Sequence, residues 1–233
     1  MDVMVGAYGS SYFSEGAAYV VYGTNTSEAY DASFLDLGGG GDGGLDELDG
    51  FILTGVMVQK ELYAELLQDT LDRQMSLQYT GNLLSAAGDV NGDGYSDILV
   101  GSPTAGTGSE GHTYLLFGGI NLPARLDLQA SDDASSVNEG VVVFKGASRD
   151  EAGYSCSGGF DINGDGFSDF IIGAPFGGTV GQSEGGAYVV FGQENLADSD
   201  TVMLDTELDG SNGFHIMGPS RDAFAGVAVA GIG

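Results

Sequence analysis

Short apolar blocks alternate with breaks rich in Gly, Asp and Ser along most of the chain. Four kinds of block recur in a fixed order. The first kind reads "DVMVGAY", "DILVGSP" and "DFIIGAP" from Asp2, Asp97 and Asp169. The second kind reads "EGAAYVVYG", "EGHTYLLFG" and "EGGAYVVFG" from Glu15, Glu110 and Glu184. The third kind reads "DGFILTG", "EGVVVFKG" and "NGFHIMG" from Asp49, Glu139 and Asn212. The fourth reads "GNLLSAAG", "GYSCSGGF" and "GVAVAGIG" from Gly81, Gly153 and Gly226. Each block is short and rich in β-branched or aromatic residues, which predicts a strand.

Four short strands repeated about every 70 residues predict four-stranded antiparallel blades of a β-propeller. The expected fold is therefore all-β, with about three blades in one repeat array over residues 1–233. We expect a blade without its first strand at 1–55, full blades at 81–146 and 153–218, and the first strand of a further blade at 224–233. Three blades are too few to close a propeller, so we expect assembly with further blades or exchange of a strand.

Residues 56–80 interrupt the repeat and carry a different periodicity. Tyr63, Leu67, Leu71 and Met75 recur every four residues, which predicts an amphipathic helix near 57–77. Two roles stay open for this helix: packing on its own blade, or binding a partner or a second copy.

The polar positions with the most chemistry lie in two matching loops, "DVNGDGYSD" at 89–97 and "DINGDGFSD" at 161–169. Oxygen donors alternate along each loop, and a Gly stands where the chain must turn sharply. All donors are hard oxygens without His or Cys, which favours Ca²⁺ over Zn²⁺ or copper. The expected ligands of two Ca²⁺ sites are Asp89, Asn91, Asp93, Asp97 and the Tyr95 carbonyl in one loop, and Asp161, Asn163, Asp165, Asp169 and the Phe167 carbonyl in the other.

These loops are not EF-hands. An EF-hand needs a Glu at its twelfth position and flanking helices, but Val100 and Ile172 stand at that position and the flanks are strand-like. A metal-free Asn/Asp/Gly-rich hairpin is the remaining alternative. Three carboxylates crowded into each of two copies make it the weaker one, because that crowding is unfavourable without a cation.

Composition excludes several classes of function. The chain has 34 acidic and 6 basic residues and a formal net charge of −28, which disfavours nucleic acid and anionic membranes. No apolar run is long enough to span a membrane, and the start has no signal-peptide pattern. Cys156 is the sole cysteine and is expected in the core, and no nucleophile–base constellation is visible, so we expect no enzyme.

Taken together, "DVNGDGYSDILVGSP", "DINGDGFSDFIIGAP", "YVVFG" and "LDGSNGFHIMG" resemble the FG-GAP repeat, the blade unit of integrin α-chain propellers and of bacterial integrin-α-like surface proteins. The resemblance implies a propeller with Ca²⁺ between the first and second strands of a blade, an extracellular location, and adhesion to a protein or cell-surface ligand. It places ligand binding on the face opposite the Ca²⁺ loops. Two alternatives stay open: a carbohydrate-binding propeller, and a non-catalytic arm of a larger secreted hydrolase or toxin.

Overall fold

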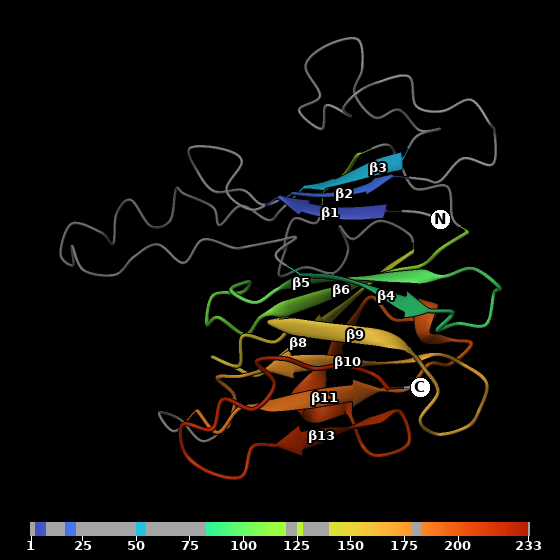
Figure 1. Ribbon diagram of the computed structural model, residues 1–233. Coiled ribbons are helices and arrows are strands. Elements are labelled where there is room, and N and C mark those ends of the chain that lie inside the picture. The colour runs from blue at the N-terminus through green and yellow to red at the C-terminus, as the bar shows by residue number, and fades with distance from the viewer. Residues whose placement is uncertain are drawn as a thin grey trace.

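The computed structural model has three twisted sheets stacked side by side in its described part (Figure 1). The structure describes residues 3–7, 17–21, 50–54, 83–119, 125–127, 140–178 and 183–232. The helix predicted near 57–77 lies outside these residues. Strand is the dominant element in the described part, which confirms the all-β class with propeller-type blades.

The central and last sheets are each built on four antiparallel strands. In the central sheet the order from inside to outside is β4 (Leu83–Gly88), β5 (Asp97–Ser102), β6 (His112–Leu116) and β8 (Val141–Lys145). The last sheet runs β9 (Ser155–Phe160), β10 (Asp169–Ala174), β11 (Gly186–Val190) and β13 (Gly213–Met217). Consecutive strands pair as hairpins, so the repeated blocks become repeated ladders.

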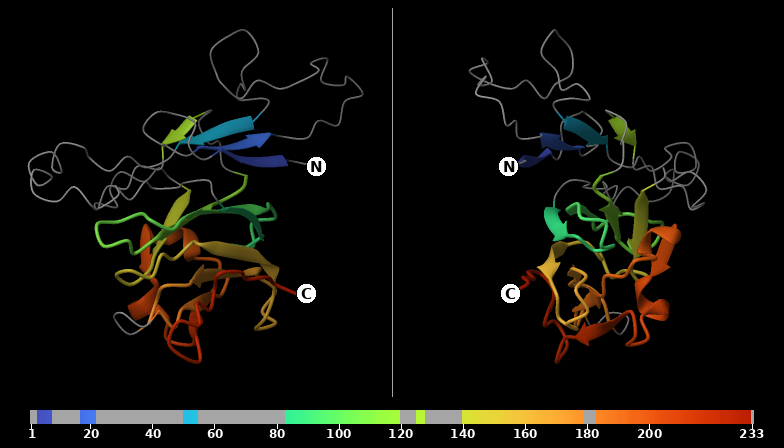
Figure 2. Two further views of the ribbon diagram at one scale, coloured as in Figure 1. Left: turned by 60° about the vertical axis from the view of Figure 1, so that its left-hand side comes forward. Right: turned by 90° about the vertical axis from the view of Figure 1, so that its right-hand side faces the viewer.

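The first sheet holds three antiparallel strands, β1 (Val3–Ala7), β2 (Ala17–Val21) and β3 (Gly50–Thr54), and lies beside the central sheet (Figures 1 and 2). We name the three sheets blades 1, 2 and 3 in chain order. The exact domain boundaries given above stay predictions.

The sequence did not predict two further strands, which lie inside the acidic connections between the third and fourth strands of blades 2 and 3. β7 (Arg125–Asp127) pairs in parallel with β3, and β12 (Thr201–Met203) pairs in parallel with β8. Each connection thus adds a strand to the outer edge of the preceding blade. We call β7 and β12 the covering strands.

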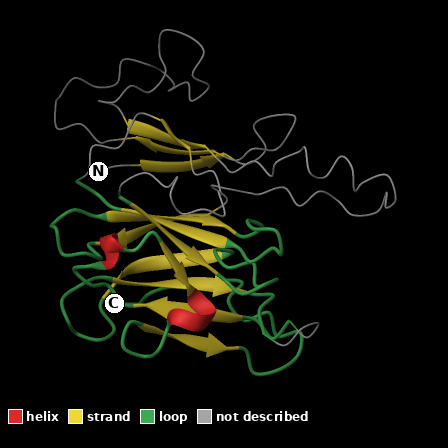
Figure 3. Ribbon diagram, turned by 180° about the vertical axis from the view of Figure 1, so that it is seen from behind, coloured by secondary structure: helices red, strands yellow, loops and turns green. Residues whose placement is uncertain are grey.

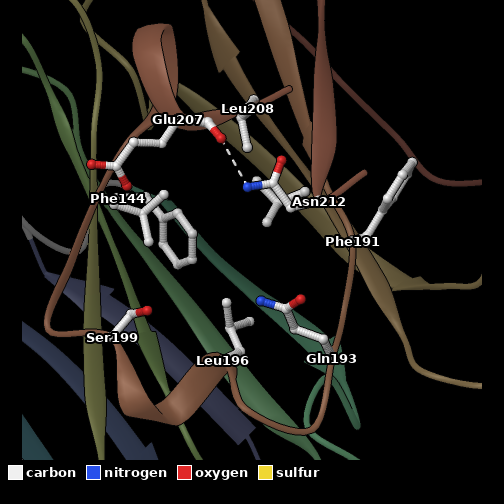
Figure 4. A pocket seen from close by; sticks show the side chains of 10 residues that line it. Phe144, Phe191, Gln193, Leu196, Ser199, Glu207, Leu208 and Asn212 are labelled. Atoms are coloured by element: carbon white, nitrogen blue, oxygen red, sulfur yellow. Dashed lines mark hydrogen bonds between the residues drawn. The ribbon is translucent and has the colours of Figure 1, made fainter. Parts of the chain in front are cut away.

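The connection that carries β12 also folds over the core between blades 2 and 3. Its short helices η2 (Leu196–Asp198) and α2 (Leu204–Glu207) bury Leu196 and Leu204 (Figure 3). Beneath them, Phe144 packs edge-to-face on Phe170 of blade 3 with ring centroids 5.1 Å apart. A pocket of about 90 Å³ remains between this connection and Phe144 (Figure 4).

The segment expected to be a first strand at 224–233 forms no strand over its described residues, 224–232. It nevertheless runs beside β9: Ser155 Oγ donates to the Gly226 carbonyl at 2.7 Å, and Gly231 N donates to Ser157 Oγ at 3.0 Å. Cys156 is buried as expected, and burial raises the pKa of its thiol to about 12.

Candidate metal-binding loops

Both nine-residue loops join the first strand of a blade to its second, at the same end of the molecule. Residues 89–97 follow β4 and lead into β5, and residues 161–169 follow β9 and lead into β10. The structure therefore gathers the five predicted oxygen donors of each set in one loop. The two sets stay separate, one on blade 2 and one on blade 3.

The two loops have nearly the same internal hydrogen bonds. Asp89 accepts from Gly92 N at 2.8 Å and from Gly94 N at 3.0 Å, and Asp161 accepts from Gly164 N at 2.7 Å and from Gly166 N at 3.0 Å. The bond between the third and fifth residues repeats as well. The Asn91 side chain donates to Asp93 at 3.0 Å, and the Asn163 side chain donates to Asp165 at 2.8 Å. The recurrence of this network shows that the sequence motif encodes one backbone shape.

Glycine is required inside that shape for a conformational reason. Gly94 and Gly166 have φ of +90° and +93°, and a Cβ at either position would meet no atom within 4 Å. The left-handed backbone, rather than lack of space, therefore selects glycine here. This outcome agrees with the sharp turn expected from the sequence.

The last aspartate of each loop anchors the loop to its blade. Asp97 is buried, and its two oxygens accept from Val90 N and Gly118 N, both at 2.8 Å. Asp169 likewise accepts from Ile162 N at 2.6 Å and Gly192 N at 2.9 Å. Gly118 and Gly192 end the "LLFG" and "VVFG" blocks, so the "FG" glycines hold the loop aspartates in place, a link that the spacing of the repeats could have suggested.

Burial and neighbouring carboxylates raise the pKa values of these two anchoring aspartates. Burial raises the pKa of Asp97 to about 6, against the lowering effect of its two backbone donors, and Asp93 and Asp89 raise it further. Burial also raises the pKa of Asp169, with Asp165 acting in the same direction. In each loop, negative charge thus accumulates near a buried carboxylate with no described basic group to offset it.

The donor set fits a hard divalent cation. Each anchor oxygen accepts one backbone N–H and has a second lone pair for a metal, and a cation would relieve the repulsion between carboxylates. Within the described ranges, no three Asp, Glu, His or Cys side chains already stand close enough together to hold an ion. Binding would therefore require half-buried Asp89 and exposed Asp93 to swing toward Asp97.

The loop of blade 2 is also part of the contact between blades. Asp89 and Val90 accept, through their carbonyls, from Ser168 N and Gln193 N of blade 3, both at 2.9 Å. A Cβ on Gly92 would lie 2.7 Å from the Phe167 ring. The blade 2 loop is therefore in direct contact with blade 3.

The opposite end of the molecule carries the loops between second and third strands and the links between blades. All six described non-glycine residues with positive φ lie there: Ser109, Arg149, Glu151, Ser183, Asp222 and Phe224. Tyr154, Phe176 and Phe224 form a partly exposed aromatic strip at this end, with successive ring centroids 6.2 Å and 5.6 Å apart. Backbone strain of this kind clusters at functional sites.

A buried polar cluster at this end was not foreseen from the sequence. Asp150, in the link between blades 2 and 3, accepts from the Tyr188 hydroxyl at 2.5 Å and from Ala147 N at 3.0 Å. The Tyr188 ring stacks on His215, with centroids 4.3 Å apart. In the turn before β6, Glu110 accepts from Gly108 N at 3.0 Å.

Fold and loops together define propeller blades with an aspartate-rich loop between their first and second strands. Blades 2 and 3 contain FG-GAP repeats: the family model described as FG-GAP repeat matches residues 81–116 and 152–190. This confirms the resemblance seen in the sequence.

Comparison with known proteins points the same way. The chain is 33% identical over 94 residues to integrin alpha pat-2 of Caenorhabditis elegans and 38% identical over 100 residues to integrin alpha-PS3 of Drosophila melanogaster. These matches cover 40% and 41% of this chain but 7% and 8% of the relatives. A third relative is the phosphatidylinositol-glycan-specific phospholipase D of Bos taurus, 34% identical over 145 residues, or 57% of this chain and 16% of that protein.

The chain thus corresponds to a small part of each of these relatives. No helix in the described part of the chain has the length and apolar character needed to cross a bilayer.

Proposed function

We propose that the chain is a Ca²⁺-stabilised segment of an extracellular β-propeller that binds a protein or cell-surface ligand and has no catalytic role. The observation that supports it most directly is the pair of loops at 89–97 and 161–169, which repeat both their oxygen donors and nearly all of their hydrogen bonds. The integrin α relatives support the adhesive role. The metal ligands proposed are the ten residues predicted above.

Ca²⁺ would have a structural role and would stabilise the folded state. Bound in the blade 2 loop, it would neutralise Asp89, Asp93 and Asp97 and stiffen the loop that touches blade 3. Extracellular Ca²⁺ modules bind at about 10⁻⁴–10⁻³ M. At free Ca²⁺ of about 100 times Kd, each site would stabilise the folded state by about 2.7 kcal/mol.

Calorimetric titration of Ca²⁺ into chelator-treated protein, with thermal melts alongside, tests the proposal. We expect two sites and a rise in melting temperature, with Mg²⁺ far less effective. Asp93→Ala and Asp165→Ala should each remove one site. They should lower the melting temperature more in Ca²⁺ than in chelator. In chelator each variant loses two hydrogen bonds of an exposed loop, one donated by a backbone N–H (Tyr95 or Phe167) and one by a neighbouring Asn side chain.

Asp209→Ala is the matched control. Asp209 also accepts from a backbone N–H two residues ahead, Ser211 N at 2.9 Å, in an exposed turn outside both loops. Asp209→Ala should lower the melting temperature by the same amount in Ca²⁺ and in chelator. Absence of Ca²⁺ binding by the folded protein would overturn the metal assignment.

The ligand-binding face is proposed at the end that carries the aromatic strip. Exposed aromatic side chains are favoured at binding interfaces. Tyr154→Ala and Phe176→Ala should weaken capture of a cell-surface ligand and leave Ca²⁺ binding unchanged. Because exposed aromatic rings also stack on sugars, a glycan array distinguishes the carbohydrate-binding alternative: glycan hits that disappear in both variants would favour it over a protein ligand.

A further inference from the structure

Asparagine is followed by glycine at three places in the chain: Asn91-Gly92, Asn163-Gly164 and Asn212-Gly213. Such pairs are the ones most open to spontaneous deamidation, because glycine has no side chain to hinder attack by its own backbone nitrogen. By sequence alone the three pairs are equal. The structure separates them, since two pairs lie in the aspartate-rich loops and the third lies where β13 begins.

Deamidation consumes water and releases ammonia, and it needs no oxidant or other reactant. The glycine nitrogen loses its proton and bonds to the side-chain carbonyl carbon of the asparagine, and the side-chain amide leaves as ammonia. Water then opens the succinimide ring to give aspartate or isoaspartate. A pair can therefore react only when the glycine N–H is released from its acceptor and the asparagine side chain is free to turn toward it.

The sheet holds Asn212 against this reaction. Its side-chain nitrogen donates to the Glu207 carbonyl at 2.8 Å, and its side-chain oxygen accepts from Asp209 N at 3.1 Å. Its own carbonyl accepts from Phe191 N at 2.9 Å, and Gly213 is a buried residue of β13 that pairs with β11. The two reacting groups could meet only if this end of β13 left β11.

The two loop asparagines are held by side chains instead. Asn91 and Asn163 lie between strands, and their side-chain nitrogens donate to the carboxylates two residues ahead at 3.0 Å and 2.8 Å. Gly92 N and Gly164 N donate to the first aspartate of their loops at 2.8 Å and 2.7 Å. All four acceptors are carboxylates, which can turn away by rotation about side-chain bonds while the ladders of the blade stay intact. A small local opening thus frees both reacting groups.

The charge of each loop favours that opening when no cation is present. Three aspartates share each nine-residue loop, and like charges at short range repel one another. A cation bound by these carboxylates would hold them in place, and with them the glycine N–H and the asparagine side chain. This protective effect rests on the proposed function, whereas the contrast with Asn212 does not.

We propose that Asn91 and Asn163 are sites of spontaneous deamidation, and that a cation bound in each loop slows the reaction. The two products differ in their effect. Aspartate adds a carboxylate to the donor set at an unchanged position. Isoaspartate adds a methylene to the main chain before the glycine and moves the donors that follow out of place. Time spent without Ca²⁺ is thereby recorded as a permanent loss of Ca²⁺ sites.

Peptide mass spectrometry of the chain, aged at neutral pH in chelator or in Ca²⁺, tests the proposal. Deamidated peptides gain the mass difference between an amide and an acid, and Asn212 is the standard within the same molecule. In chelator, Asn91 and Asn163 should react at least about tenfold faster than Asn212, because an exposed loop opens at a lower free energy than a strand within a sheet. At free Ca²⁺ of about 100 times Kd, both rates should fall by up to about a hundredfold, since only loops without Ca²⁺ open.

Asp161→Ala tests the restraint itself, because it removes the acceptor of Gly164 N. In chelator this variant should raise the rate at Asn163 about tenfold, the effect of losing one hydrogen bond to a charged group. The rate at Asn91, in the other loop, should not change. A thermal melt in chelator checks that the variant is folded. Asp209→Ala, in an exposed turn outside both loops, is the matched control and should alter neither loop rate.

Two results would overturn the proposal. One is rates at Asn91 and Asn163 no higher than the rate at Asn212 in chelator. The other is rates that Ca²⁺ leaves unchanged in protein that binds Ca²⁺ by calorimetry. Absence of Ca²⁺ binding would overturn the proposed function and the protection by Ca²⁺ together, and the comparison with Asn212 in chelator would still decide the deamidation separately. In aged protein that binds Ca²⁺, the fraction of sites lost should match the fraction of isoaspartate.

Discussion

The bond between Tyr188 and Asp150 ties the third strand of blade 3 to the link that precedes that blade, and its contribution to stability can be predicted. Tyr188 and Asp150 are 1% and 3% exposed, and their oxygens are 2.5 Å apart. Tyr188→Phe removes the hydroxyl and leaves the Asp150 carboxylate with the Ala147 N–H, which donates to it at 3.0 Å. A hydrogen bond to a charged group contributes about 1.5–3 kcal/mol. We therefore expect Tyr188→Phe to lower the free energy of unfolding by about 2 kcal/mol.

Urea denaturation at pH 7 measures this change, with an unchanged m-value showing that the transition keeps its cooperativity. Asp150→Ala and the double variant complete a cycle. The two changes should be less than additive by about 1–2 kcal/mol, since either one alone breaks the shared bond.

Tyr114→Phe is the matched control. Tyr114 holds the same place in blade 2 and is buried, and among the described residues its hydroxyl is paired with the Nδ1 atom of His112, at the long distance of 3.5 Å. Removal of the Tyr114 hydroxyl should lower the free energy of unfolding by less than about 1 kcal/mol. Equal costs for the two Tyr→Phe changes, or additive behaviour of Tyr188→Phe and Asp150→Ala, would refute the reasoning.

The pH dependence gives an independent check. Burial raises the pKa of Asp150 in the folded state, and the Tyr188 hydroxyl lowers it. A raised folded pKa means that the associated stability is present at low pH and is lost as the pH rises through that pKa. Tyr188→Phe should raise the pKa further, so its cost should grow between pH 4 and pH 7.

Further predictions concern the core of blade 2 and the packing between blades. Burial, with a smaller effect of Lys145, lowers the pKa of His112 to about 4, so stability present above pH 6.5 is lost as the pH falls toward 4. Between pH 7.5 and pH 5, this titration should lower the free energy of unfolding of the parent protein by about 2 kcal/mol. His112→Gln should abolish that part of the pH dependence. At Gly101, a Cβ would lie 2.2 Å from the Gly153 carbonyl oxygen, so Gly101→Ala should destabilise by about 1–3 kcal/mol in thermal or urea melts. Unchanged melts for Gly101→Ala would show that the blades can move apart at that point.

The sequence alone determined much of this protein. The strand blocks, their order and the turns of the two aspartate-rich loops follow from local rules: β-branched residues favour strands, and Gly and Asp break them. These features repeat at a fixed period, so each copy supports the interpretation of the other. Cys156 in the core and Glu110 bonded to a turn were also predictable from their immediate neighbours.

Tertiary structure alone decided the contacts between distant segments. Nothing local marks Arg125–Asp127 or Thr201–Met203 as strands, because their ladders form with the preceding blade and not with a sequence neighbour. Asp150 looks like a surface residue of a link, yet the fold buries it against Tyr188, 38 residues away. Such pairings depend on how blades stack, which the pattern of one segment does not contain.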